Sequence, residues 1–195
     1  MAAPLGVRQI EALPVVAYRE LRPKLKSGDL LFTSGDYLAS QLIRKFTESP
    51  WSHVGIVFRV DAIDRVLVLE SVEDMGVRFA PLSKYLSDYD EGKPYRGRAV
   101  IARCARLDRK SLEKIAAFGT DQLTRAYDRG EIMDIAARIA LGYPRPKRDR
   151  AYICSELVHE CFARAGRAFG YDRRGFISPE NIWRDPRVSL IGRIL

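Results

Sequence analysis

Residues 52–71 read SHVGIVFRVDAIDRVLVLES, and this stretch decides the fold. Two runs dense in Val, Ile and Leu, 52–60 and 66–71, flank the polar segment DAIDR. Such runs favour β-strands, and a short polar connection between them is typical of a hairpin. The sequence therefore predicts an antiparallel hairpin with its turn near residues 61–64.

Outward from this hairpin, further strands and helices are indicated by the spacing of apolar residues. Three short apolar runs bounded by turn residues predict strands at 30–33, 77–82 and 98–104. Helical periods recur at 37–46, 111–127, 131–141 and 152–166, with one short turn after Ser178–Pro179. Strands gathered early and helices late indicate an α+β fold, a small antiparallel sheet of about five strands packed against the helix that bears Cys154. We expect one domain over residues 1–195, of which 1–26 form an N-terminal lead-in.

The chain has only two histidines, so a histidine-dependent enzyme must use His53 or His159. His53 begins the first strand of the hairpin and Glu70 ends the second, which places them across from each other within two residues of register. A neighbouring strand pair can hold an imidazole and a carboxylate within hydrogen-bond reach, the arrangement that orients a catalytic base. The alternatives are a strand-end histidine with a purely structural partner and a glutamate that reaches solvent.

Of the three cysteines, Cys154 alone lies in the first turn of a predicted helix. A helix N-terminus favours thiolate over thiol, and the preceding Arg148 and Arg150 add to that effect. Cys154 also lies on the apolar stripe of its helix, so a small buried hydrophobe is the competing interpretation. Cys161 and Cys104 are expected in the core.

Neither a metal nor an organic cofactor is predicted. His159 points away from Cys154 and Cys161 around the helix, which makes a shared metal site awkward. His159-Glu160 lacks the second histidine of a zinc-protease helix, and no Gly-rich phosphate loop is present.

The net charge is +8, and from Arg138 onward twelve Lys and Arg stand against six Asp and Glu. This excess is compatible with attraction to a polyanion or with an Arg-rich solvated surface. No aromatic-interleaved basic stripe or nucleic-acid motif is present, so we expect no specific nucleic-acid partner.

No apolar run approaches the roughly 20 residues that a membrane-spanning helix needs, so no transmembrane segment is expected. Arg8, Glu11 and Pro14 interrupt the apolar residues of the N-terminus, which lacks the order of a secretory signal. The sequence therefore predicts a cytoplasmic protein, with signal-independent export left open. It does not indicate the oligomeric state.

Several short motifs occur in the order GDLLF, WSHVGIV, a strand ending in Glu, AYD, YICSELV and ISPENIWRD. Together they resemble the permuted NlpC-type papain-like cysteine amidases, specifically the YiiX/YaeF-like group. The resemblance runs from about Gly28 to Asp185, and SHVGI followed by a distant CSELV is its most specific part. His53 precedes Cys154, which matches the circularly permuted arrangement of a papain-like fold, since only the spatial constellation matters.

The resemblance implies Cys154 as nucleophile, His53 as base and Glu70 as the group that orients the histidine. It also singles out Tyr127 and Asp128, which match a Tyr-Asp pair upstream of the family's cysteine. Five side chains are candidates for substrate binding: Tyr127, Asp128, Ser52, Tyr152 and Ser155.

The expected activity is cleavage of an amide or ester bond through a thioacyl-enzyme on Cys154, so the expected partner is a peptide, amide or acyl substrate. Two other classes of protein stay open. One is an acyltransferase or lipid-acting enzyme with the same three residues, and the other is an inert binding module for anionic polymers. Many relatives carry an export signal and act on envelope components, a signal that this chain is not predicted to have.

Overall fold

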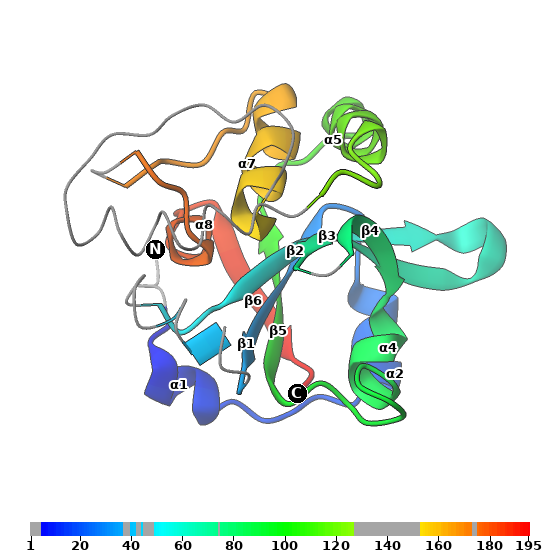
Figure 1. Ribbon diagram of the computed structural model, residues 1–195, viewed down its shortest axis with the longest axis vertical. Coiled ribbons are helices and arrows are strands. Elements are labelled where there is room, and N and C mark those ends of the chain that lie inside the picture. Colours follow the sequence, from blue (N-terminus) through cyan, green and yellow to red (C-terminus); the bar gives the residue numbers. More distant parts are fainter. Residues whose placement is uncertain are drawn as a thin grey trace.

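The computed structural model describes residues 5–36, 40–41, 44, 49–73, 75–126, 153–172 and 175–195. In this part of the chain a six-stranded antiparallel sheet has the order β4-β3-β2-β1-β5-β6 (Figure 1). The strands are β1 Asp29–Gly35, β2 His53–Val60, β3 Arg65–Val72, β4 Gly76–Pro81, β5 Gly97–Cys104 and β6 Val188–Arg193. The α+β class and the predicted hairpin, β2 and β3, are confirmed.

The two faces of the sheet are covered by different helices, as Figure 1 shows. The helices are α1 Val7–Glu11, α2 Tyr18–Leu21, α4 Leu82–Ser87, α5 Arg109–Asp121, α7 Cys154–Arg164 and α8 Pro179–Trp183. Because side chains alternate along a strand, β2 sends Val54 and Ile56 into the core under α7, and Val57 into the core under α4. Helix α7 therefore lies across β2 and β3, on the sheet face opposite α4.

Two helix starts follow from local sequence. Asp108 accepts a hydrogen bond from Ser111 N–H at the start of α5, and Ser178 caps α8 ahead of Pro179, as the Ser-Pro pair predicts. The prediction for α5 was too long. The helix ends at Asp121, and the chain then turns to pair with β4, where Thr124 N–H donates to the Val77 carbonyl at 2.9 Å.

The prediction of about five strands was also wrong by one. The missed strand, β6, lies at the edge of the sheet and pairs with β5, with a register irregularity at Ile101/Ala102. Its side chains are mostly half-buried, and it lacks the dense run of buried residues that marks β1, β2 and β3.

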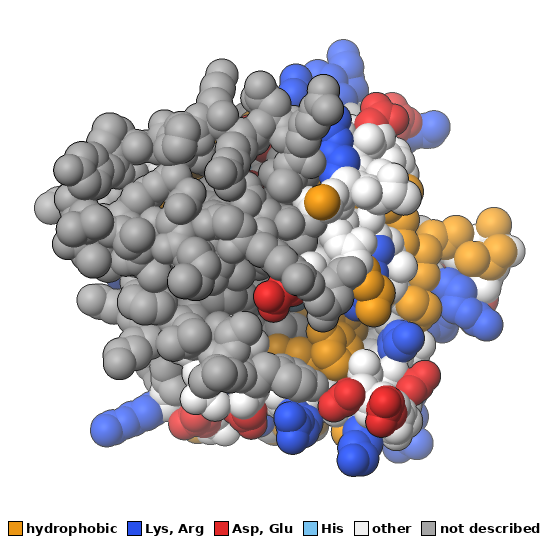
Figure 2. Space-filling model, in the orientation of Figure 1, with side chains coloured by type: hydrophobic (Ala, Val, Ile, Leu, Met, Phe, Trp, Pro, Cys, Tyr) orange, Lys and Arg blue, Asp and Glu red, His pale blue; other side chains and the backbone are white. Residues whose placement is uncertain are grey.

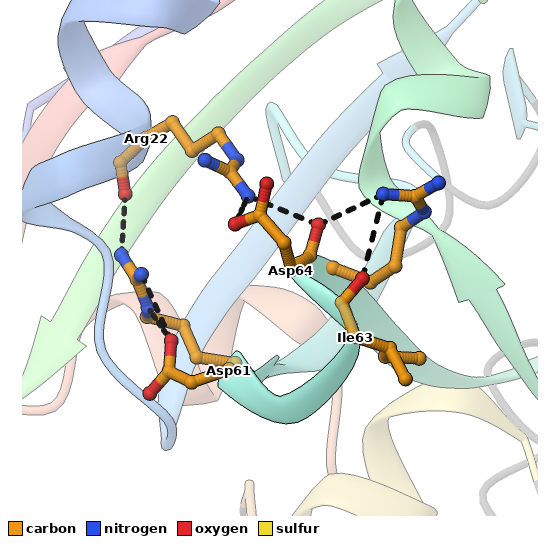
Figure 3. Close-up of polar contacts among 6 residues, drawn as sticks. Arg22, Asp61, Ile63 and Asp64 are labelled. Carbon is orange, nitrogen blue, oxygen red and sulfur yellow. Dashed lines mark hydrogen bonds and ion pairs between the residues drawn. The ribbon is translucent and has the colours of Figure 1, made fainter.

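The tip of the β2–β3 hairpin is tied to the lead-in by arginines (Figure 3). Arg22 donates to the carboxylate of Asp64 and to its carbonyl at 3.1 Å. Arg59 in turn donates to the Arg22 carbonyl at 3.0 Å and to Asp61. Since a register slip of one residue would reverse which face each side chain occupies, these ties help to fix the hairpin that carries His53 and Glu70.

Part of the predicted structure lies outside the described residues, namely the helix at 131–141 and most of that at 37–46. Within the described residues, no helix combines the length and apolar content that crossing a membrane requires. On the face shown in Figure 2, the described Lys and Arg side chains are dispersed among acidic and hydrophobic ones.

Candidate active site

His53 and Glu70 meet at the end of the hairpin that is farthest from its turn. The β2–β3 pairs run from Val60↔Arg65 to Ile56↔Leu69, so the next position across from Glu70 is Gly55. His53 lies two residues further along β2 on the same face, and its Nε2 is 2.9 Å from Oε2 of Glu70. The histidine side chain is 15% exposed, whereas that of the glutamate is fully buried.

Gly55 keeps the space beside Glu70 open. A Cβ at this position would lie 2.6 Å from Cγ1 of Val68 and 3.4 Å from Cβ of Glu70. A side chain here would therefore crowd Val68 and Glu70, beside the carboxylate that His53 contacts.

Cys154 reaches the same place from the other layer, as the first residue of α7. Its Sγ is hydrogen-bonded with His53 and accepts from the backbone N–H groups of Val54 and Ser155. The β2–β3 ladder has ended before Val54, which leaves this part of β2 available to the helix terminus. With Nε2 of His53 on Glu70, Nδ1 is the ring nitrogen left for the thiol.

The three groups shift one another's protonation. Burial opposes the imidazolium, but Cys154 and Glu70 outweigh it and raise the pKa of His53 to about 10. Burial also opposes the thiolate, yet His53 and the two backbone donors lower the pKa of Cys154. The site therefore favours a thiolate–imidazolium pair near neutral pH, the state in which a cysteine is nucleophilic.

A comparison with known families decides what kind of protein carries this site. Residues 24–171 match the family described as permuted papain-like amidase enzyme, YaeF/YiiX, C92 family. The chain belongs to this family. Its members are amidases of the cysteine peptidase class, so the protein is an enzyme of the cysteine amidase type.

Among solved structures, this amidase resembles the crystal structure of metalloprotein YiiX from Escherichia coli O157:H7. The TM-score is 0.65 at 18% sequence identity, over 86% of this chain and 97% of that one. This likeness shows a shared fold. No curated protein matches the chain in a sequence search.

Two residues that the sequence analysis missed complete the surroundings of Glu70 in this amidase. Arg78 lies directly opposite Glu70 in the β3–β4 register and donates to Oε1 at 2.9 Å. Tyr85, from α4, donates its hydroxyl to Oε2. Pairing the two strands predicted at 66–71 and 77–82 would have put Arg78 opposite Glu70. Nothing in the local sequence points to Tyr85.

The candidates for substrate binding fare differently. Ser52 is buried, and its hydroxyl contacts the Gly35 N–H and the Thr33 carbonyl. Ser155 is buried too and donates to the Ile177 carbonyl at 2.8 Å. Both hydroxyls are thus engaged with backbone groups. The remaining three candidates, Tyr127, Asp128 and Tyr152, lie outside the described residues.

Cys161, Cys104 and His159 are all buried, as expected for the two cysteines. Burial raises the pKa of Cys161 to about 12, and it raises the pKa of Cys104 as well. His159 packs its ring against Tyr171 on the far side of α7 from Cys154. Within the described ranges, no group of three or more His, Cys, Asp or Glu side chains is placed to hold a metal ion.

Proposed function

We propose that the protein hydrolyses an amide bond through a covalent intermediate on Cys154, with His53 as base and acid and Glu70 as its orienting group. The observation that carries the proposal is the continuous hydrogen-bonded series from the Cys154 sulfur through His53 to the buried carboxylate of Glu70. It joins the start of a helix to the end of a hairpin, and each member shifts the pKa of the next.

In the first half of the reaction, the Cys154 thiolate attacks the amide carbonyl and forms a carbon–sulfur bond. The imidazolium of His53 then gives its proton to the leaving nitrogen, the carbon–nitrogen bond breaks, and a thioester remains. Cys154 is the first residue of α7, so its backbone N–H has no partner within the helix and is suited to stabilise the oxyanion.

In the second half, neutral His53 takes a proton from water as the water attacks the thioester. The carbon–sulfur bond breaks, the acid leaves, and the thiolate–imidazolium pair is restored. Glu70 accepts from Nε2 throughout, which fixes the tautomer that leaves Nδ1 facing the sulfur.

The test has two stages, because the acyl group is not defined by the site. Purified protein is first screened against amide, ester and thioester panels, and intact-mass spectrometry then looks for an acyl adduct on Cys154. We expect an adduct in the wild type and none in Cys154→Ala, while Cys161→Ala serves as the matched control and keeps the adduct. Turnover that survives Cys154→Ala would rule the proposal out.

Product analysis in the same screen separates the neighbouring activities. Release of a free acid identifies a hydrolase, whereas transfer of the acyl group to an added amine or alcohol identifies an acyltransferase. Absence of any adduct with every panel, together with an unreactive Cys154, would favour an inert binding module.

A further inference from the structure

The carboxylate of Glu70 is fully buried, and it must stay charged in order to support the His53 imidazolium. An ionised carboxylate taken out of water is expensive and takes up a proton unless donors surround it. Among the described residues, three side chains from three different elements face it: His53 from β2, Arg78 from β4 and Tyr85 from α4. The Cys154 thiolate on α7 contacts His53 and acts on the carboxylate through the imidazole.

The donors are divided between the two carboxylate oxygens. Oε1 takes both Nε and Nη2 of Arg78, each at 2.9 Å. Oε2 takes Nε2 of His53 at 2.9 Å and the hydroxyl of Tyr85. Arg78 thus binds Oε1, which His53 does not contact, whereas Tyr85 and His53 share Oε2.

The two holders are themselves fixed. Arg78 is directly across the ladder from Glu70 and is 21% exposed, so the pair is shielded from most of the solvent. Tyr85 is fully buried, and its ring packs against Tyr89 and Tyr95, with centroids 4.8 Å and 5.5 Å away. Tyr85 cannot turn away from the carboxylate without disturbing these packed rings, and Arg78 is held by its two bonds to Oε1.

We propose that Arg78 and Tyr85 are positioning residues of the active site: they keep Glu70 ionised and rotated towards His53, and the reactivity of Cys154 depends on them. The proposal rests on the proposed function, since it assigns roles within that same site. With Arg78 present, the buried charges of Cys154, His53, Glu70 and Arg78 balance. Removing the guanidinium leaves the buried Glu70 carboxylate short of a compensating charge and favours its protonation. A neutral Glu70 supports the His53 imidazolium less, and the Cys154 thiolate is weakened in turn.

A second pair in the same sheet offers a matched control. Asp29 and Arg103 also lie directly opposite each other, across β1 and β5, with Nε 2.7 Å from Oδ1. The carboxylate is 1% exposed and the arginine 28%, close to the values of the Glu70–Arg78 pair. Asp29 has no contact with His53 among the bonds of the described residues; its other oxygen accepts from Lys26 N–H and caps a turn.

The experiment measures the rate of iodoacetamide alkylation of Cys154 against pH, by peptide mass spectrometry, in the full chain. The acid limb of this rate–pH curve is the range in which the rate rises as Cys154 loses its proton. Arg78→Met should move this limb upward by about one pH unit, so that alkylation at a fixed acidic pH is about tenfold slower. Arg78→Lys should recover part of the shift because it keeps the charge. Tyr85→Phe should move the limb less, in the same direction.

Arg103→Met is expected to lose stability to a similar degree and to leave the limb unmoved. If Arg103→Met shifts the limb as far as Arg78→Met does, or if Arg78→Met superimposes on the wild type, the positioning role is wrong. Should Arg78→Met fail to fold, Arg78→Lys and Tyr85→Phe still decide the question, and wild-type limbs in both would overturn it.

A double mutant separates action through Glu70 from direct action on the thiol. In a Glu70→Gln background, Arg78→Met should add little further shift, because the group it positions is already neutral. A full additional shift would show that Arg78 acts without Glu70, contrary to the proposal. If wild-type Cys154 reacts no faster than Cys161, the proposed function itself fails and the positioning roles fall with it.

Discussion

The two cysteines of α7 occupy the same buried stripe of one helix and have opposite chemistry. Cys154 is 5% exposed and Cys161 is fully buried, so burial does not separate them. Yet the pKa of Cys154 is lowered, whereas that of Cys161 is raised to about 12. The difference lies in what surrounds the sulfur: His53 and two backbone donors at the helix start, against a mid-helix position where burial dominates. The opposite pKa shifts of the two thiols therefore follow from the groups around each sulfur and not from burial.

The largest expected effect is on turnover. Because the nucleophile is the one group that forms the covalent intermediate, Cys154→Ala should lower kcat by about four to six orders of magnitude. Cys161→Ala should keep kcat and lose about 1 kcal/mol of unfolding free energy from a core position. Steady-state kinetics on any substrate found, with urea unfolding of both variants, measures the two effects. Equal loss of turnover in the two variants would erase the contrast.

Next is the labelling of the two thiols in one molecule. At pH 6, iodoacetamide should modify Cys154 at least about a hundredfold faster than Cys161, since thiolate fraction controls the reaction. His53→Gln should remove most of that advantage, because the imidazolium is what stabilises the thiolate. Peptide mapping at several time points gives both rates. Fast labelling of Cys154 in His53→Gln would show that the backbone donors, and not His53, activate the thiol.

The pH profile of kcat/KM should show an alkaline limb near pH 10, where His53 loses its proton. Glu70 contributes to the raised pKa of that imidazolium, so Glu70→Gln should move the limb to lower pH by about one unit. Activity should remain measurable, since the proposed role of Glu70 is to orient His53 and not to react. A limb that stays in place would show that the carboxylate does not support the charge of His53.

Two glycines sharpen the contrast between the surroundings of Cys154 and Cys161. Gly119 of α5 faces the Cys161 end, where a Cβ would lie 2.4 Å from Cδ2 of Leu69 and 3.3 Å from the sulfur. Gly55 lies across from Glu70, where a Cβ would lie 3.4 Å from Cβ of that residue. Either glycine replaced by alanine should cost about 1–3 kcal/mol of unfolding free energy through overpacking. Only Gly55→Ala should also slow Cys154 alkylation, and equal alkylation rates in both would remove Gly55 from the site.

The smallest expected effect concerns the binding of nucleic acid by the basic residues ahead of α7. The basic cluster Arg145, Lys147, Arg148 and Arg150 precedes the Cys154 end of α7 in sequence and lies outside the described residues. At about 0.15 M salt, where charge acts over about 8 Å, we expect no saturable binding to DNA or RNA in a gel-shift titration. Replacing the four residues with Gln should alter turnover more than nucleic acid retention. Tight binding at this salt concentration would favour the binding-module alternative.

Local sequence was sufficient for the elements that bear the candidate site. The apolar runs on both sides of DAIDR specify the hairpin, the helical period specifies α7, and Ser178–Pro179 specifies the start of α8. These features depend on neighbours within a few residues, where strand alternation, helix period and capping operate. The same local patterns placed His53 and Glu70 on adjacent strands and Cys154 at a helix start.

The tertiary structure alone decided the contacts between elements. The edge strand β6 exists because β5 offers it a ladder, and its own half-buried pattern is too weak to predict it. The carboxylate of Glu70 stays charged because Arg78 and Tyr85 arrive from a neighbouring strand and from α4. The pKa of Cys154 depends on a backbone donor of β2 that is free only because the β2–β3 ladder ends early. Burial, register and shared donors join residues far apart in the chain, so they depend on the packing of the whole sheet and its helices.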